Sequence, residues 1–217
     1  MKTHSGISVC TLWLCLAAGS PCSAVAEPQG KSRATLAPRE TALQLVLDKG
    51  SVEFVAVGWP SALRIRGKGE ELTGSLAVTE GGIEGEVVFS LDCLDTGIAL
   101  RNRHMREEYL ETARFPRAVF RPTTVAVKQL ARTSAFDGEQ VPFEGELELH
   151  GVTRPVQGLA RVTREASRVK VDATFEVRTL DFQIPIPRYM GITVAEDVKV
   201  TVHFAGHVDT HDPETQP

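Results

Sequence analysis

The side chains best suited to chemistry gather in one charged segment, residues 101–111. Guanidinium groups bind phosphate, pyrophosphate or carboxylate groups through paired hydrogen bonds. The arginines of this segment alternate with glutamates, so surface ion pairs of little energetic value are the plainer interpretation. Only residues three or four apart share a helix face. The side chains that we predict to meet an anionic head group are Arg103, His104 and Arg106.

Histidines raise the question of a metal ion. Those in 203–211 are spaced by four residues, but the segment alternates like a strand, where four residues span about 13 Å. Bonds from zinc to its ligands are only about 2 Å long, so these side chains do not share an ion. His104 has Glu107 and Glu108 at helical spacing, but arginines stand between them. We therefore predict no metal site and no cofactor.

Catalytic groups do not assemble into a recognisable set. The paired glutamates at 70–71 and 107–108 are neighbours on charged segments, and neither a glycine-rich phosphate loop nor a zinc-type cysteine spacing is found. Cys93 shares the strand parity of apolar residues, which predicts a buried, unreactive side chain. We predict that the protein is not an enzyme.

The first 26 residues have the features of a secretory signal peptide. Lys2 precedes a mostly apolar run at 7–18, and small residues follow at 24–26. The run is shorter than the roughly 20 residues that a membrane span requires. We expect cleavage after Ala26 and a periplasmic or secreted product without an internal disulfide. The net charge of −4 disfavours a nucleic-acid partner.

The remainder of the chain reads as one domain with two irregular ends. Residues 27–41 contain prolines and scattered charges and indicate a flexible leader, and the polar residues 209–217 indicate a disordered tail. The domain between them, 42–208, is long enough to bury a real core. Its one helix-compatible stretch is 101–113, where we expect a short helix.

Alternation of apolar and polar residues dominates the domain, and this period is typical of half-buried strands. Eight or nine antiparallel strands of this kind form either a sandwich or a closed barrel. The alternation is clearest in 82–93, 140–150, 167–178 and 197–208, and weaker in 43–48, 51–59, 70–79, 117–127 and 152–164.

An ordered series of motifs across 43–208 closely resembles the YceI-like family. The motifs are Thr96-Gly97 with the block 101–111, Phe115-Pro116 with Phe120, the strand-turn-strand segment 145–156, Phe182-Gln183-Ile184, Gly191-Ile192 and the closing strand 197–202. The resemblance implies an exported, lipocalin-like, antiparallel eight-stranded barrel that binds polyisoprenoids or related amphiphiles in its interior.

Large apolar side chains on the inward parity are the predicted ligand contacts. Taken singly, each is better explained as part of a self-filled core, and the binding interpretation rests on the set as a whole. Small residues share that parity in the same strands, and a mixture of small and large side chains leaves room for a tunnel. A 15-carbon chain buried there would gain roughly 12 kcal/mol before the costs of association. The predicted contacts are Phe54, Trp59, Phe89, Leu91, Phe143, Leu147, Phe175 and Phe204.

The sequence therefore predicts an exported binding protein that holds a polyisoprenoid or another long-chain amphiphilic lipid. The helix and the loop 181–192 are expected to guard the opening, with Arg188 and Tyr189 as a second candidate rim. Two alternatives stay open: a ligand-free periplasmic stress-response or interaction module, and an accessory carrier of quinone-like isoprenoids for a membrane redox partner. No membrane span is expected, and a homodimer stays open.

Overall fold

The computed structural model describes residues 43–59, 63–79, 82–125, 133–189 and 192–209. The predicted signal peptide, the predicted leader and nearly all of the predicted tail lie outside these ranges. Within them, no helix combines the length and the apolar character needed to cross a lipid bilayer.

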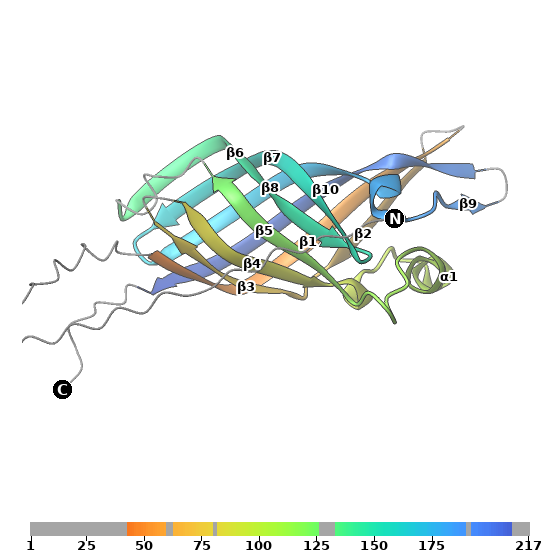
Figure 1. Cartoon of the computed structure of the whole chain (residues 1–217), viewed down its shortest axis with the longest axis horizontal. Coiled ribbons are helices and arrows are strands. Elements are labelled where there is room, and N and C mark those ends of the chain that lie inside the picture. The colour runs from red at the N-terminus through yellow and green to blue at the C-terminus, as the bar shows by residue number, and fades with distance from the viewer. Residues whose placement is uncertain (1–42, 60–62, 80–81, 126–132, 190–191, 210–217) are drawn as a thin grey trace, which may run out of the picture. The chain divides into compact units, whose positions relative to one another are not determined.

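Antiparallel strands make up most of the described chain (Figure 1). In chain order the elements are β1 (Leu43–Trp59), β2 (Leu63–Gly69), β3 (Leu72–Val78), β4 (Ile83–Ser90), η1 (Leu91–Cys93), α1 (Ala99–His104), η2 (Met105–Tyr109), β5 (Arg117–Val125), β6 (Ala135–Leu149), β7 (Val152–Glu165), β8 (Arg168–Arg178), η3 (Thr179–Phe182), β9 (Arg188–Tyr189) and β10 (Ile192–Asp209).

Pairing between the first and last long strands closes the sheet. The order is β1-β3-β4-β5-β6-β7-β8-β10, and β10 pairs back onto β1 from Gln44↔Asp209 to Trp59↔Thr193. The short strands β2 and β9 extend β1 and β10 beyond this ring. β2 and β3 hold a common register on β1, as Val52↔Gly69 and Val46↔Ser75 show, so they form one interrupted strand. The predicted eight-stranded barrel is confirmed, and the sandwich is excluded.

Alternating burial explains why these segments form strands with one face inward. In β6, Val141, Phe143 and Leu147 are buried while Pro142 and Glu144 are exposed. Successive strand side chains point to opposite faces, so this period puts every second residue inside the barrel.

Aromatic rings pack against each other across the interior. Phe143 meets Phe120 edge-on at 5.7 Å between ring centroids and Phe175 at 6.1 Å. This geometry adds about 0.5–1.5 kcal/mol per pair to the burial of the rings.

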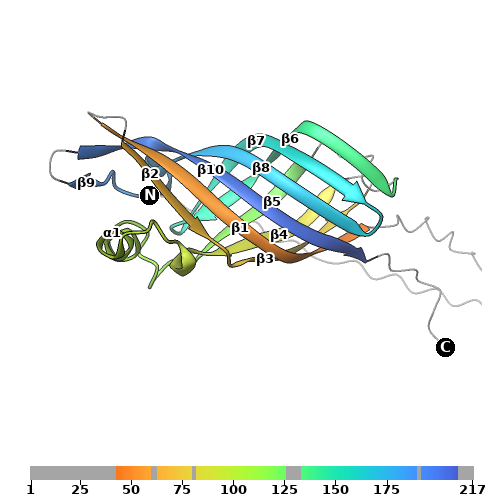
Figure 2. The same cartoon turned by 180° about the vertical axis from the view of Figure 1, so that it is seen from behind.

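All helical turns lie at one end of the barrel, which we call the helix end. There α1 and η2 connect β4 to β5, and η3 connects β8 to β9, while the β1–β2 hairpin projects at the same end (Figures 1 and 2). The helix predicted at 101–113 is observed at 99–109, with its second half wound as a π-helical turn. A turn of this kind inside a helix is uncommon and often found at functional sites.

Two local predictions are corrected by the structure. Cys93 does not continue β4, because the strand ends at Ser90 and a 3₁₀ turn follows. Its half-buried thiol donates a hydrogen bond to the Ser90 carbonyl at 3.0 Å. Strand alternation in 140–150 also predicts His150 on the polar face, but it is only 9% exposed. With φ of 53° at His150 and 73° at Gly151, the pair forms a tight turn that directs the imidazole inward.

Candidate ligand-binding cavity

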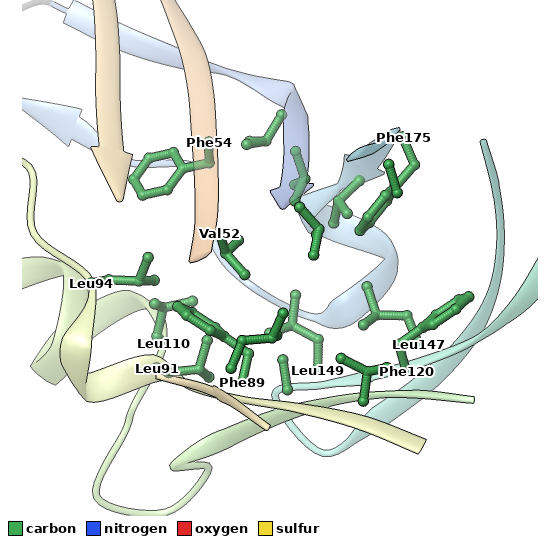
Figure 3. A pocket seen from close by; sticks show the side chains of 18 of the residues that line it. Val52, Phe54, Phe89, Leu91, Leu94, Leu110, Phe120, Leu147, Leu149 and Phe175 are labelled. Carbon is green, nitrogen blue, oxygen red and sulfur yellow. The ribbon is translucent and has the colours of Figure 1, made fainter. Parts of the chain in front are cut away.

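The barrel encloses a cavity of about 570 Å³, a volume within the range of small-molecule sites. Aliphatic and aromatic side chains from every strand of the ring line it. The close-up shows part of this lining, including Phe89, Phe120 and Phe175 (Figure 3). The exceptions are five polar or partly polar residues that belong to the segments of the helix end: Thr96, Arg101, His104, Tyr109 and Thr179. The interior therefore offers a hydrocarbon environment, with polar groups confined to the helix end.

Small side chains leave part of this space open. Ala160 of β7 and Ala173 of β8 are directly paired across the sheet, and both line the cavity. Gly158 of β7, paired with Phe175 of β8, instead makes room for the Phe143 ring, which an added Cβ would meet at 2.8 Å. The mixture of small and large inward residues thus shapes the cavity.

The predicted apolar contacts line the cavity with one exception. Those that do so are Phe54, Phe89, Leu91, Phe143, Leu147, Phe175 and Phe204. Trp59 is 76% exposed and lies outside the lining, which corrects its predicted inward orientation. Pairing of β1 with β2 is regular from Val52 to Gly58, although the pairing of β1 with β10 shifts register between Ala56 and Gly58. The alternation along the β2 edge turns Phe54 inward and Trp59 outward.

Of the three residues of the predicted basic rim, one lines the cavity and two do not. His104 lines the cavity, whereas Arg103 is exposed and outside the lining. Arg106 also lies outside it, because its guanidinium donates to the Leu94 carbonyl at 2.9 Å. The rim of Arg103, His104 and Arg106 therefore does not form as one surface. His104 Nε2 lies 3.9 Å from the Glu108 carboxylate.

A hydrogen-bond network fixes the start of α1 at the edge of the cavity. The Asn102 side-chain oxygen accepts from the Thr96 amide at 2.8 Å and from its hydroxyl at 2.6 Å. Arg101 donates to the Thr96 hydroxyl and carbonyl oxygens at 2.8 and 2.6 Å. Asp95 accepts from the Gly97 amide at 2.7 Å and from the Asn102 amide group at 2.6 Å. Arg101 thus lines the cavity with its guanidinium already engaged by the protein.

Acid should weaken this network through Asp95. The Gly97 backbone hydrogen bond, followed by that of Asn102, lowers the pKa of Asp95 below its usual value of 3.8. A depressed carboxyl pKa stabilises the fold above the usual value, and this contribution is lost as pH falls through the folded-state pKa. Asp95→Asn should therefore unfold more easily than the wild type at neutral pH. The difference in the free energy of unfolding between the variant and the wild type should shrink as the pH falls below about 4, measured by urea unfolding. A difference independent of pH would contradict this role.

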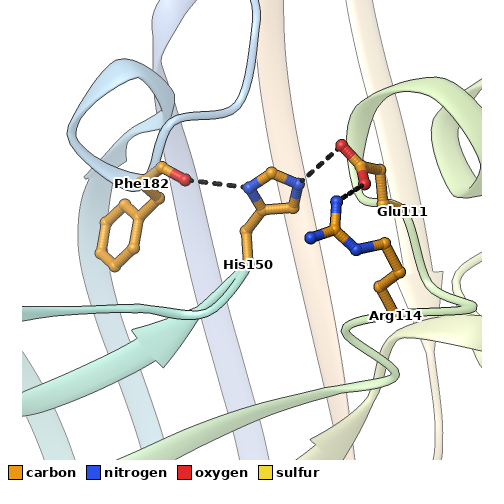
Figure 4. Close-up of polar contacts among 4 residues, drawn as sticks. All are labelled: Glu111, Arg114, His150 and Phe182. Atoms are coloured by element: carbon orange, nitrogen blue, oxygen red, sulfur yellow. Dashed lines mark hydrogen bonds and ion pairs between the residues drawn. The ribbon is translucent and has the colours of Figure 1, made fainter.

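His150 ties together the two segments that flank the cavity at the helix end (Figure 4). Its Nδ1–H donates to the Phe182 carbonyl at 3.1 Å, since a carbonyl only accepts. Its Nε2 lies 3.5 Å from Glu111, and the ring packs on Phe115 at 4.6 Å between centroids. A hydrogen bond from Arg114 at 2.7 Å is the main cause that lowers the pKa of Glu111. The β6–β7 turn therefore holds both η3 and the chain after η2.

The loop after β8 contributes residues to the core and to the cavity lining that were not among the ligand contacts predicted from the sequence. Phe182 is 2% exposed and packs in a cluster with Leu147, Val177 and Ile184. Ile184 and Pro187 line the cavity, whereas Arg188 lies outside the lining and is exposed. Gln183 makes this turn tight with a φ of 59°. In the sequence, the local signal for the turn is an apolar residue on each side of Gln183.

Two further histidines of the described residues, His203 and His207, contact carboxylates on the outer surface. His203 lies 2.6 Å from Asp172, and His207 lies 2.6 Å from Asp48. In the part of the chain that the structure describes, no three histidine, cysteine or acidic side chains are close enough to hold a metal ion.

An eight-stranded antiparallel barrel around an apolar cavity defines the lipocalin-like class of barrel. Within that class the chain belongs to the YceI-like family, whose domain matches residues 43–205.

Similar proteins share this fold or part of the sequence. Protein YceI of Escherichia coli O157:H7 is 30% identical over 105 residues, and a protein of Enterobacter sp. (strain 638) is 33% identical over 105 residues. Each match covers 45% of this chain, which spans about half the length of these relatives. A polyisoprenoid binding domain from Saccharophagus degradans, implicated in plant cell wall breakdown, superposes with a TM-score of 0.62 at 20% identity. That superposition covers 77% of this chain and 99% of the domain.

Proposed function

We propose that this protein is an exported, periplasmic or secreted carrier that holds the hydrocarbon part of a polyisoprenoid or another long-chain amphiphilic lipid inside its barrel. The observation that carries the proposal is the cavity of about 570 Å³, lined from strand to strand by apolar side chains. The family and the binding activity named for the Saccharophagus degradans domain support the same class of ligand.

Physical chemistry explains why such a cavity suits the hydrocarbon chain of a ligand, which has no polar groups. Each buried methylene contributes about 0.8 kcal/mol, so affinity grows with chain length and needs no specific hydrogen bond. A charged group deep in the barrel would lose its hydration without finding a partner there, which is costly. The polar end of the ligand therefore belongs at the helix end, near Tyr109 and His104.

The alternative of a solid barrel that acts only through its surface is less well supported. Such a barrel needs its interior filled by its own side chains, whereas the small neighbouring residues Ala160 and Ala173 line a cavity of about 570 Å³. A carrier of quinone-like isoprenoids is a special case of the proposed function and uses the same cavity. The described residues present no set of catalytic side chains around the cavity, so we propose binding without chemical conversion.

Lipid analysis of the protein from its native host tests the proposal. We expect organic extraction and mass spectrometry to find an isoprenoid or long-chain amphiphile in stoichiometric amount. Denatured and reprecipitated protein, carried through the same extraction, serves as the control for lipid that adheres to the surface. Extracts no richer in lipid than this control would contradict the carrier function.

A further inference from the structure

Exposed large apolar side chains are concentrated at the helix end. Trp59 is 76% exposed at the end of β1, and Leu180 in η3 is 45% exposed. Leu63 of β2 is 41% exposed, Ile98 at the start of α1 is 52% exposed, and Leu100 within α1 is 47% exposed. The last residues of β1, the start of β2, α1 and η3 all lie at this end of the barrel (Figures 1 and 2), so these residues belong to the same end.

The exposed side chains are continuous with the cavity. Leu63, Ile98 and Leu100 line the cavity and are also exposed to solvent. The interior apolar surface therefore reaches the outside at the helix end, beside the polar lining residues of that end. Clustered exposed apolar side chains of this kind mark an interaction surface.

Basic side chains accompany this apolar frame. Arg64 and Arg66 of β2, Arg103 of α1 and Arg188 of β9 are exposed, and none has an ion-pair partner within the described ranges. Carboxylates at the same end are partly engaged, since Glu196 pairs with Arg178 at 3.1 Å. A tryptophan ring beside aliphatic tips and unpaired arginines matches the chemistry of a bilayer interface, where indole rings settle and basic groups meet anionic lipid.

We propose that the helix end docks on the surface of a lipid bilayer that contains anionic lipid, with Trp59, Leu63, Ile98, Leu100 and Leu180 at the acyl-chain boundary. This inference rests on the proposed function, because it supplies the route by which the ligand enters and leaves. A hydrocarbon chain that crosses water loses favourable burial with every methylene. Docking with the opening against the bilayer lets the chain pass between two apolar environments.

Vesicle binding of matched variants tests the docking surface. The protein is purified as its native host processes it, and is floated with vesicles of phosphatidylcholine alone and of phosphatidylcholine with phosphatidylglycerol. The test variant combines Trp59→Ser with Leu180→Ser, since neither residue lines the cavity. The control is Leu159→Ser, a residue that is 50% exposed in β7 and outside the lining. Lipid content is measured by mass spectrometry in all preparations.

The expected result is binding of the wild type and of Leu159→Ser to vesicles, stronger with phosphatidylglycerol. The double variant should bind vesicles at least about tenfold more weakly than the wild type, with its bound lipid unchanged. Equal vesicle binding of the double variant and the control overturns the docking surface. The docking surface is also overturned if the wild type does not bind vesicles but forms dimers and the double variant does not. Wild-type protein without bound lipid, but with vesicle binding that depends on Trp59 and Leu180, refutes the carrier function and leaves the docking surface intact.

Discussion

Ala173→Phe should remove most of the bound lipid without unfolding the barrel. Ala173 lines the cavity opposite Ala160, so a phenyl ring there would occupy space that the hydrocarbon chain needs. We expect lipid content, measured by extraction and mass spectrometry, to fall about tenfold or more. The free energy of unfolding should be retained, because an apolar ring would fill open apolar space.

Thr174→Phe is the matched control for this substitution. Thr174 is the next residue of β8 and lies outside the cavity lining, so its side chain points to the outer face. This variant should keep its lipid. In a barrel packed solid, Ala173→Phe would instead cost about 1–3 kcal/mol of stability through overpacking. Such a loss, with no change in lipid content, would contradict the cavity.

Phe182→Ala should cause the largest loss of stability, about 3–5 kcal/mol, because a buried aromatic ring is replaced by a cavity. Phe182 is 2% exposed and anchors η3 against Leu147, Val177 and Ile184. Its carbonyl also accepts the His150 hydrogen bond. The substitution should therefore loosen the 179–187 segment, seen as faster amide hydrogen exchange there than in β6.

Leu180→Ala provides the comparison within the same turn. Leu180 is 45% exposed and should change the free energy of unfolding by no more than about 0.5 kcal/mol. Urea unfolding of the two variants measures the difference. If Phe182→Ala is no more destabilising than Leu180→Ala, then the η3 anchor is not part of the core.

Strand period was enough to predict most of the interior. Phe89, Phe143 and Phe175 lie in segments with clean alternation, so their inward orientation follows from local geometry. The same rule would have turned Trp59 outward, because it is an odd number of residues from Phe54 and the pairing of β1 with β2 is regular from Val52 to Gly58. Closure of the sheet depends on the pairing of β1 with β10, which local pattern does not encode; the family motifs supplied that prediction.

Polar groups at the helix end were harder to predict. Arg101 and Arg106 belong to a run that looks like a free cationic surface, but both guanidinium groups bond to backbone oxygens of Leu94 or Thr96. His150 is drawn inward by a turn whose two residues adopt positive φ and by the Phe182 carbonyl, which is far away in sequence. Such partners are set by tertiary packing and leave no local signal.

A high-resolution structure of the protein purified from its native host tests the central claim most directly. We predict continuous density for a hydrocarbon chain inside the barrel, in contact with Phe89, Phe143 and Phe175, with the polar end of the molecule near Tyr109 at the helix end. Side chains of the protein that fill this space from end to end, with lipid only on the outer surface, would contradict it.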